Sequence, residues 1–397
     1  MIKAQTLKGF RDFLPSEAKK RQFVINTLKK VFESYGFEPL ETPALEYEEI
    51  LLGKYGDEGD KLMYRFVDNG KRKVALRYDQ TVPLARVVAQ YQNELPMPFK
   101  RYQIQPVWRA ENTQKGRFRE FLQCDIDTVG ASSPLADAEI IVIAAKSLEK
   151  LGLKNYKIRV GDRKLFEGIP QAAITIIDKL KKVGLEKVKA ELKTKGLDEK
   201  IFDKVKNSKP SPEIELILGI AQEMGVADKV YFDPALARGL DYYTGMILEA
   251  EIDGFDAGSV GGGGRYDKLI GMFAGKDIPA VGFAFGFDRL MEAMEELNLF
   301  PKDLQTTKVL VTVFSEELKQ QALDCSMKLR ESGVTTELYL DENAKMEKQL
   351  KYADKKQIPY VVIIGPDEVT NNKVTIRNMK TREQKTIKPQ ELISQLQ

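Results

Sequence analysis

The chain has 397 residues, of which 43% are hydrophobic and 30% are charged, so it is long enough for two or three domains with their own cores. Its net charge of +3 is too small to indicate nucleic-acid binding by itself. It contains no histidine, which excludes that residue as a general base, a metal ligand or a pH switch.

The two cysteines, Cys124 and Cys325, lie far apart in the chain and form neither a disulfide framework nor a metal-ligand pattern. This usage favours a reducing compartment. The first residues lack the apolar core of a signal peptide, and no apolar run approaches the length of a membrane span. We therefore expect a cytoplasmic protein with no membrane segment.

The first predicted elements belong to a large N-terminal region. Apolar residues recur at helical spacing from 16 to 35, and Gly36 follows as a stop signal, which predicts a helix. The proline-punctuated segment "GFEPLETPALEY" comes next and is expected to be extended. A buried helix is predicted from 135 to 151. Between 165 and 227 lysine-rich amphipathic helices dominate, which indicates a helical insertion.

A second region begins near residue 306, after "NLFPKDLQTT". Three apolar strand-like segments, "VLVTVF", "TELYL" and "YVVIIG", alternate there with two predicted helices. Such alternation predicts a parallel sheet covered by helices on both faces. The tail from 373 to 388 is predicted to be a mostly basic hairpin. We expect residues 306–397 to form a separate α/β domain.

The segments "FKRYQIQPVWRAE" and "FREFLQCDIDTVG" alternate between apolar and polar residues on either side of a short loop. Successive strand side chains face opposite sides, so an antiparallel hairpin with one apolar and one polar face is expected. The polar face would hold Arg101, Gln103, Gln105, Arg109, Glu111, Arg119, Phe121, Gln123, Asp125 and Asp127. A solvated sheet face accounts for this pattern, and so does a binding site for an anionic ligand that bears a ring.

Other stretches share this polar, glycine-flanked character. "LRYDQTVPLAR" places Asp79 and Thr81 on one side of a predicted extended segment that ends at Pro83. "GSVGGGGRYD" is glycine-rich enough for the backbone to approach a ligand, although it matches neither a P-loop nor a dinucleotide fingerprint. "ALARGLDYYTG" holds Arg238 four residues before two adjacent tyrosines, and "AVGFAFGFDRL" is a small-residue strand followed by Arg289. Taken singly, each of these stretches is also typical of a turn or a tight strand–helix junction.

Together these pieces resemble the class II aminoacyl-tRNA synthetases, and specifically the histidyl-tRNA synthetases, over essentially the whole chain. "GFEPLETPALEY" resembles the first class motif, with Pro43; "VWRAE" and "GRFREFLQCDID" resemble the second, with Arg109 and Glu111; "GFAFGFDRL" resembles the third, with Arg289. "ARGLDYYTG" resembles a signature of histidyl enzymes and their close paralogues.

The resemblance implies an α+β fold, in which an antiparallel sheet flanked by helices forms a class II catalytic domain over residues 1–305. The helical insertion would span about 165–227, and residues 306–397 would be an α/β anticodon-binding domain. The implied activity is ATP-dependent formation of histidyl-adenylate from histidine, followed by transfer of the histidyl group to the 3′ end of tRNA(His). ATP and Mg²⁺ are the implied cofactors, and the first class motif implies a homodimer.

The resemblance also assigns roles to individual residues. Arg109 and Arg238 would hold the α-phosphate from two sides, and Arg289 would bind the terminal phosphates. The adenine would contact Glu111 and stack on Phe121. The remaining assignments concern histidine: its α-ammonium group would be held by Asp79, Thr81 and Gln123, and its imidazole ring by Asp127 and Tyr243, with Tyr242 beside them.

Two related protein classes are alternatives. One is the regulatory subunit of ATP phosphoribosyltransferase, a paralogue that usually lacks the anticodon-binding domain and the ATP-site arginines. Here Arg109, Arg238 and Arg289 are all present. The other is a class II synthetase for threonine or proline, whose pockets do not carry the "RGLDYYTG" signature. Within the implied anticodon-binding domain, the basic hairpin at 373–388 is a candidate for phosphate contacts or simply a solvated charged hairpin.

Overall fold

The predicted hairpin forms two ten-residue antiparallel strands, β5 (Phe99–Trp108) and β6 (Glu120–Val129), in the computed structural model. The structure describes residues 2–113, 117–178, 180–198, 200–238, 242–256, 258–301 and 303–396. Contacts divide the chain into two units, Met1–Phe300 and Pro301–Gln397.

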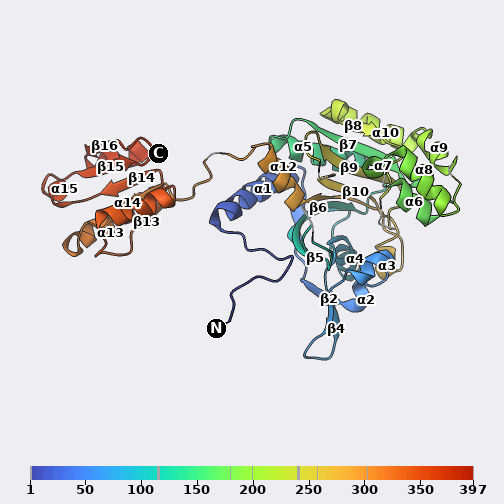
Figure 1. Ribbon diagram of the computed structural model, residues 1–397, viewed down its shortest axis with the longest axis horizontal. Coiled ribbons are helices and arrows are strands. Elements are labelled where there is room, and N and C mark those ends of the chain that lie inside the picture. The colour runs from blue at the N-terminus through green and yellow to red at the C-terminus, as the bar shows by residue number, and fades with distance from the viewer. Residues whose placement is uncertain are drawn as a thin grey trace. The chain divides into compact units, whose positions relative to one another are not determined.

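The first unit is built on an eight-stranded sheet with the order β1-β5-β6-β11-β10-β9-β7-β8 (Figure 1). Neighbouring strands are antiparallel except for two parallel pairs, β1–β5 and β7–β8. This antiparallel-rich sheet with helices confirms the α+β fold expected from the sequence. The other strands are β1 (Glu38–Pro39), β7 (Tyr156–Asp162), β8 (Val230–Phe232), β9 (Met246–Ile252), β10 (Gly261–Arg265) and β11 (Ala280–Gly286).

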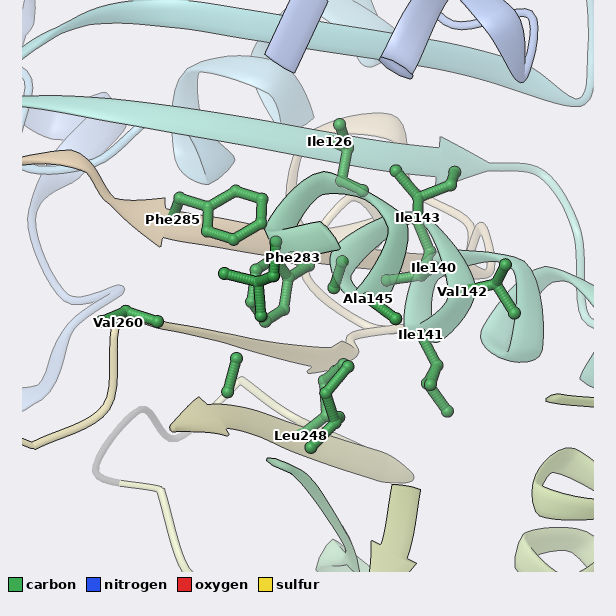
Figure 2. Close-up of a cluster of buried hydrophobic side chains, with 14 of the residues drawn as sticks. Ile126, Ile140, Ile141, Val142, Ile143, Ala145, Leu248, Val260, Phe283 and Phe285 are labelled. Carbon is green, nitrogen blue, oxygen red and sulfur yellow. The ribbon is translucent and has the colours of Figure 1, made fainter. Parts of the chain in front are cut away.

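The main core lies between this sheet and the helices α1 (Pro15–Ser34), α5 (Pro134–Lys150), α10 (Pro212–Ala221) and α12 (Phe287–Glu296). The helices predicted at 16–35 and 135–151 are thus confirmed within a residue at each end. The Ser133 side chain caps α5 by accepting a hydrogen bond from the Leu135 N–H group. Figure 2 shows the apolar run of α5, including Ile140 and Ile143, beside the sheet residue Phe283. Each such fully buried side chain contributes roughly 1.5–3 kcal/mol.

A second core lies around α4 (Thr81–Gln90) and includes residues of α2 (Glu48–Leu51), α11 (Gly271–Ala274) and a small sheet with the order β2-β4-β3. The small sheet consists of β2 (Leu45–Tyr47), β3 (Arg65–Val67) and β4 (Lys73–Leu76), and α3 (Gly56–Lys61) precedes β3.

The prediction that the segment with Asp79 and Thr81 is extended as far as Pro83 is wrong, because α4 already begins at Thr81. Pro83 is tolerated there because the first helical turn does not use its missing N–H group. The Val82 N–H group instead donates to Asp79 Oδ1 at 3.1 Å, so the carboxylate supports the start of the helix.

The lysine-rich segment between β7 and β8 is helical, and Phe166, Val188 and Phe202 belong to a separate small core there. It contains α6 (Gln171–Ile177), α7 (Leu180–Val183), α8 (Leu185–Thr194), α9 (Lys200–Lys206), α10 and the short helices η1 (Arg163–Phe166), η2 (Gln222–Val226) and η3 (Ala227–Lys229).

The second unit contains a five-stranded sheet with the order β13-β12-β14-β15-β16. The strands β12 (Val309–Val311), β13 (Thr336–Leu338) and β14 (Tyr360–Ile363) are parallel, as the alternating pattern predicts. The predicted hairpin is also present, as β15 (Val374–Asn378) and β16 (Gln384–Ile387).

The helices of this unit are α13 (Lys319–Glu331), α14 (Met346–Lys355), α15 (Pro366–Thr370) and α16 (Leu392–Leu396), with short turns η4 (Glu316–Leu318) and η5 (Pro389–Glu391). Among the residues that the structure describes in either unit, no helix has the length and apolar character needed to cross a bilayer.

Candidate active site

One cavity of about 470 Å³ in the first unit gathers the polar residues singled out in the sequence. Its walls include the polar face of β6 and the glycine-rich strands β10 and β11. Asp125 and Asp127 are only 2% and 3% exposed, so this part of the hairpin face is the wall of a site and not a solvated surface. All the predicted site residues line the cavity: Asp79, Thr81, Arg109, Glu111, Phe121, Gln123, Asp127, Arg238, Tyr242, Tyr243 and Arg289.

The glycines of β10 and β11 make room for two of these side chains. A Cβ atom at Gly262 would overlap the guanidinium group of Arg238. A Cβ atom at Gly282 would likewise overlap the carboxylate of Asp127. Interior atoms cannot overlap, so a side chain at either position would displace the charged group beside it. The glycine-rich stretch therefore forms the cavity floor through its backbone.

The side chain of Arg109 is held by one backbone carbonyl group and two aromatic rings. Its Nε atom donates to the Tyr78 carbonyl oxygen at 3.1 Å. Its guanidinium carbon lies 4.3 Å from the ring centroid of Tyr78 and 5.1 Å from that of Phe121. Stacking on two rings fixes the plane of the guanidinium group, which leaves the rest of its N–H groups available to an anion.

Arg238 reaches the cavity from the stretch before residues 239–241, which lie outside the described residues. Its Nη1 atom pairs with Glu249 Oε1 on β9 at 2.9 Å, and its guanidinium carbon lies 5.7 Å from the Tyr243 ring centroid. Burial opposes the positive charge, but Tyr243 and Glu249 outweigh that effect and hold the pKa of Arg238 above its ordinary value. Arg238 therefore carries a fixed positive charge in a half-buried position.

Arg289 stands near the start of α12. Its Nη1 atom donates to the Ser259 carbonyl oxygen at 2.9 Å. Burial, followed by repulsion from Arg117, lowers the pKa of Arg289 from its ordinary value. The nearby acidic groups do not offset the cost of burying the Arg289 charge, so an added anion would stabilise this charge. This end of the cavity therefore favours a phosphate.

Another part of the lining is rich in hydrogen-bond acceptors. Three buried oxygen atoms have no hydrogen-bond partner among the described residues: Asp79 Oδ2, Gln123 Oε1 and Asp125 Oδ1. Buried acceptors are almost always satisfied in folded proteins, so three in one cavity indicate a ligand that donates several hydrogen bonds. An ammonium group, which has three N–H donors, matches them.

Asp127 is held on both sides by buried groups. Its Oδ2 atom pairs with Arg101 Nη2 at 2.6 Å, and its Oδ1 atom accepts a hydrogen bond from the Tyr266 hydroxyl. Burial raises the pKa of Asp127, while Arg101 and Tyr266 oppose this rise. Asp79 is braced in a similar way by the Tyr55 hydroxyl, which donates to its Oδ1 atom at 2.7 Å. Both carboxylates are therefore fixed before any ligand arrives.

Two adjacent phenol rings complete the lining. The ring centroids of Tyr242 and Tyr243 lie 4.8 Å apart, and that of Tyr242 lies 5.9 Å from Tyr266. Burial raises the pKa of Tyr242 and of Tyr243, so both hydroxyls stay protonated and able to donate at neutral pH. Gly239, Leu240 and Asp241 of the tyrosine signature lie outside the described residues, as do residues 114–116 of the loop between β5 and β6.

Comparison with known proteins agrees with the family resemblance of the sequence motifs. The family model for histidyl-tRNA synthetase matches residues 9–200 and 197–290, and the model for the anticodon binding domain matches 308–397. The chain belongs to the histidyl-tRNA synthetase family. It is 40% identical to the histidine–tRNA ligase of Christiangramia forsetii over 96% of both chains, and 39% identical to that of Cytophaga hutchinsonii over the whole of both chains.

Solved structures of this family share the fold. The crystal structure of histidyl-tRNA synthetase from Nostoc sp. PCC 7120 matches with a TM-score of 0.86 and 32% identity, covering 100% of this chain and 99% of that one. A Bacillus halodurans protein described as an ATP phosphoribosyltransferase regulatory subunit/histidyl-tRNA synthetase matches with a TM-score of 0.73 at 22% identity, which shows a shared fold alone. The family model and the curated relatives therefore do not favour the regulatory-subunit alternative.

The structure adds residues that sequence reasoning left without a role. Arg101 and Asp125 were placed on the polar face of the hairpin by alternation alone, and nothing in that pattern shows that Arg101 is fully buried behind Asp127. Tyr266 follows the glycine-rich stretch, and the sequence gives no sign of its bond to Asp127. Glu249 lies on β9 with no motif around it. Only the three-dimensional pairing identifies these supporting residues.

Proposed function

We propose that this protein is a histidine–tRNA ligase that forms histidyl-adenylate from histidine and ATP and passes the histidyl group to the 3′ end of tRNA(His). The observation that carries the proposal is one cavity that combines arginines, acceptors without a partner among the described residues, and two adjacent phenol rings. In the first step a carboxylate oxygen of histidine attacks the α-phosphorus of ATP. The bond from that phosphorus to the bridging oxygen breaks, and pyrophosphate leaves.

The arginines would act on the phosphate chain. We assign Arg109 and Arg238 to the α-phosphate, where negative charge grows in the transition state, and Arg289 to the terminal phosphates. Preorganised cations in a buried site stabilise such charge without reorganising during the reaction. The nucleophile comes from the substrate, so the protein needs no activated nucleophile of its own. This agrees with a cavity that contains no histidine.

The acceptors and phenols would bind the amino acid. We assign Asp79, Thr81 and Gln123 to its α-ammonium group, and Asp127 and Tyr243, with Tyr242 beside them, to its imidazole ring. A pocket built to hydrogen-bond a polar ring rejects apolar analogues, because they leave buried groups without partners. Such a loss costs about 1–3 kcal/mol for each group.

The adenine would lie beside Glu111 and stack on Phe121, whose ring already packs near Arg109. Within the described part of the chain, no three His, Cys, Asp or Glu side chains cluster so as to hold a metal ion. Mg²⁺ would be held mainly by the phosphates of ATP, with the cavity carboxylate of Glu249, which pairs with Arg238, as a protein ligand. When bound, it neutralises part of the phosphate charge.

A homodimer is also proposed. The small sheet β2-β4-β3 exposes large apolar side chains in the region of the first class motif: Leu45 is 43% exposed, Tyr47 52%, Phe66 48% and Val67 61%. Adjoining exposed apolar residues are typical of a protein–protein interface. The protein's mass in solution, measured by light scattering, tests this. A cytoplasmic location follows from the proposed function, because tRNA is charged where translation takes place.

The direct test is amino-acid-dependent exchange of labelled pyrophosphate into ATP. Exchange that requires histidine supports the proposal. Exchange with another amino acid would make the protein a synthetase of different specificity, and no exchange with any amino acid would contradict adenylate formation. Aminoacylation of a tRNA(His) transcript then tests the second step.

A further inference from the structure

The segment before α1, residues 8–13, contacts residues that stand just before β6 and at the start of α12. Gly9 has a left-handed φ angle of +89°, and its carbonyl oxygen accepts a hydrogen bond from the Arg119 N–H group at 2.9 Å. The Arg119 carbonyl oxygen in turn accepts a hydrogen bond from the Arg109 N–H group at 2.9 Å. Two backbone hydrogen bonds therefore join this N-terminal segment to the arginine that we assign to the α-phosphate.

Arg11 is the residue of this segment that supports a wall of the cavity. Its guanidinium carbon lies 3.2 Å from the ring centroid of Phe118, and that ring lines the cavity. Its Nη2 atom pairs with Asp288 Oδ1 at 2.7 Å, and Arg21 of α1 pairs with the same oxygen at 2.9 Å. Asp288 is only 6% exposed and stands in the first turn of α12. Arg11 thus connects the Phe118 ring to a carboxylate that is buried and already held by a second arginine.

The residues that the segment contacts adjoin those that we assign to ATP. Arg119 is hydrogen-bonded to Arg109, and its Nε atom donates to the Glu111 carbonyl oxygen at 3.1 Å. Asp288 directly precedes Arg289 in α12. A displacement of the segment should therefore be felt first at the part of the cavity that would hold ATP.

We propose that Arg11 is a positioning residue for ATP in the adenylation step and that it acts through the Phe118 ring. Anchored on Asp288, it would hold this ring in the orientation in which the ring borders the bound nucleotide. A planar guanidinium group suits this task, because it stacks on a ring and pairs with a carboxylate at the same time. The inference rests on the proposed function and adds to it a residue from outside the cavity lining.

The test is Arg11→Ala in the full chain, with KM for ATP and KM for histidine measured separately by pyrophosphate exchange. We expect KM for ATP to rise about tenfold and KM for histidine to stay within about twofold of wild type. Arg11→Lys keeps a charge for Asp288 but loses the flat stacking surface, so it should restore only part of the ATP affinity. The control is Lys20→Ala, which breaks a pair with Glu295 of α12 outside the cavity lining and should change neither KM.

A similar rise in both KM values would overturn the proposal, because Arg11 would then support only the folded unit as a whole. Unchanged KM values would overturn it as well. With Phe118→Ala already present, Arg11→Ala should raise KM for ATP by less than about twofold further, since its effect passes through that ring. Full additivity of the two changes would contradict this route. A failure of the proposed function would appear as absent histidine-dependent exchange in the wild type, and so is distinguishable from a failure here.

Gly9 provides an independent test of the same segment. A methyl group there would come within 2.8 Å of the Arg119 side chain, so Gly9→Ala should also raise KM for ATP, about three- to tenfold. Gly36→Ala is the matched control, because Gly36 also has a left-handed φ angle, +76°, but a Cβ atom there meets nothing within 4 Å. Both variants carry the strain of alanine in this backbone conformation, and only the first meets Arg119. An effect of Gly9→Ala no larger than that of Gly36→Ala would show that the segment does not position the ATP site.

Discussion

The active-site cavity and the C-terminal hairpin both concentrate charge, but they do so in opposite ways. In the cavity, charged groups are held by specific neighbours: Asp127 lies between Arg101 and Tyr266, and Arg238 pairs with Glu249. In the hairpin at 373–388, every Lys or Arg except Arg377 is exposed, and these five cations have no ion-pair partner among the described residues. A single braced charge can act on one developing charge in a reaction, whereas exposed charges act by their number on a polyanion. The two regions should therefore respond differently to loss of one residue.

The largest single-residue effect is expected at Arg238. Replacing it with alanine removes a fixed cation from the buried phosphate end, and the rate of histidine-dependent pyrophosphate exchange should fall about 10²–10³-fold. Arg238→Lys keeps the charge but loses the planar pairing with Glu249, and should recover only part of the rate. Rates within about threefold of wild type for Arg238→Ala would place the essential charge elsewhere.

A somewhat smaller effect is expected at Gly262, which touches no substrate in the proposal. A methyl group there overlaps the Arg238 guanidinium group, so Gly262→Ala should displace it and lower the exchange rate about 10–100-fold. Gly219→Ala is the control, since a Cβ atom at that helical position meets nothing within 4 Å. If both alanine variants keep the wild-type rate, the position of Arg238 does not depend on the cavity floor.

The acceptor end should show its effect in substrate affinity. Asp125 Oδ1 is buried without a hydrogen-bond partner among the described residues, so we expect it to accept a hydrogen bond from histidine. Asp125→Asn should raise the KM for histidine about tenfold and leave the KM for ATP within about twofold. An equal rise in both values would indicate general distortion of the cavity. Asp253→Asn, at a more exposed carboxylate outside the cavity lining, is the matched control.

The same variant should change the pH dependence of stability. Burial raises the pKa of Asp125 well above its ordinary value, so the folded protein binds this proton more tightly than the unfolded chain does. Stability from this group is then full at low pH and is lost as pH rises from about 4 upward. Asparagine cannot ionise, so Asp125→Asn should melt about 2 °C or more above wild type at pH 7 and show no advantage at pH 4. Melting curves from pH 4 to 8 measure this difference, and an advantage confined to low pH would contradict it.

The smallest effect is expected on the helix surface of the second unit. Lys351 and Glu347 form an exposed pair on α14 at 2.7 Å, with both side chains 76% exposed. Solvent screens such pairs, so Lys351→Gln should shift the melting temperature by less than about 1 °C and leave tRNA binding unchanged. A clear loss of tRNA affinity would show that paired cations on α14 act on a polyanion as exposed, unpaired cations do.

Sequence patterns predicted those features that depend on local periodicity. Alternation located β5, β6 and the strands of the second unit, and helical spacing located α1 and α5, because burial on one face imposes those periods. The start of α4 was missed, since Pro83 reads as a break although the first turn accepts it. The residues behind the site could not be predicted at all. Arg101, Tyr266 and Glu249 act through partners that the fold, and not the local sequence, brings near.

The glycines of the cavity floor restrict how this protein could be re-engineered. Gly262, Gly263 and Gly282 offer no side chain to exchange, and any added atom meets Arg238, backbone or Asp127. A designer who wished to admit a different amino acid would have to leave this surface alone. New specificity would have to come from side chains of the cavity lining, such as Asp125, Asp127 and Tyr243, while the backbone of the floor keeps its shape.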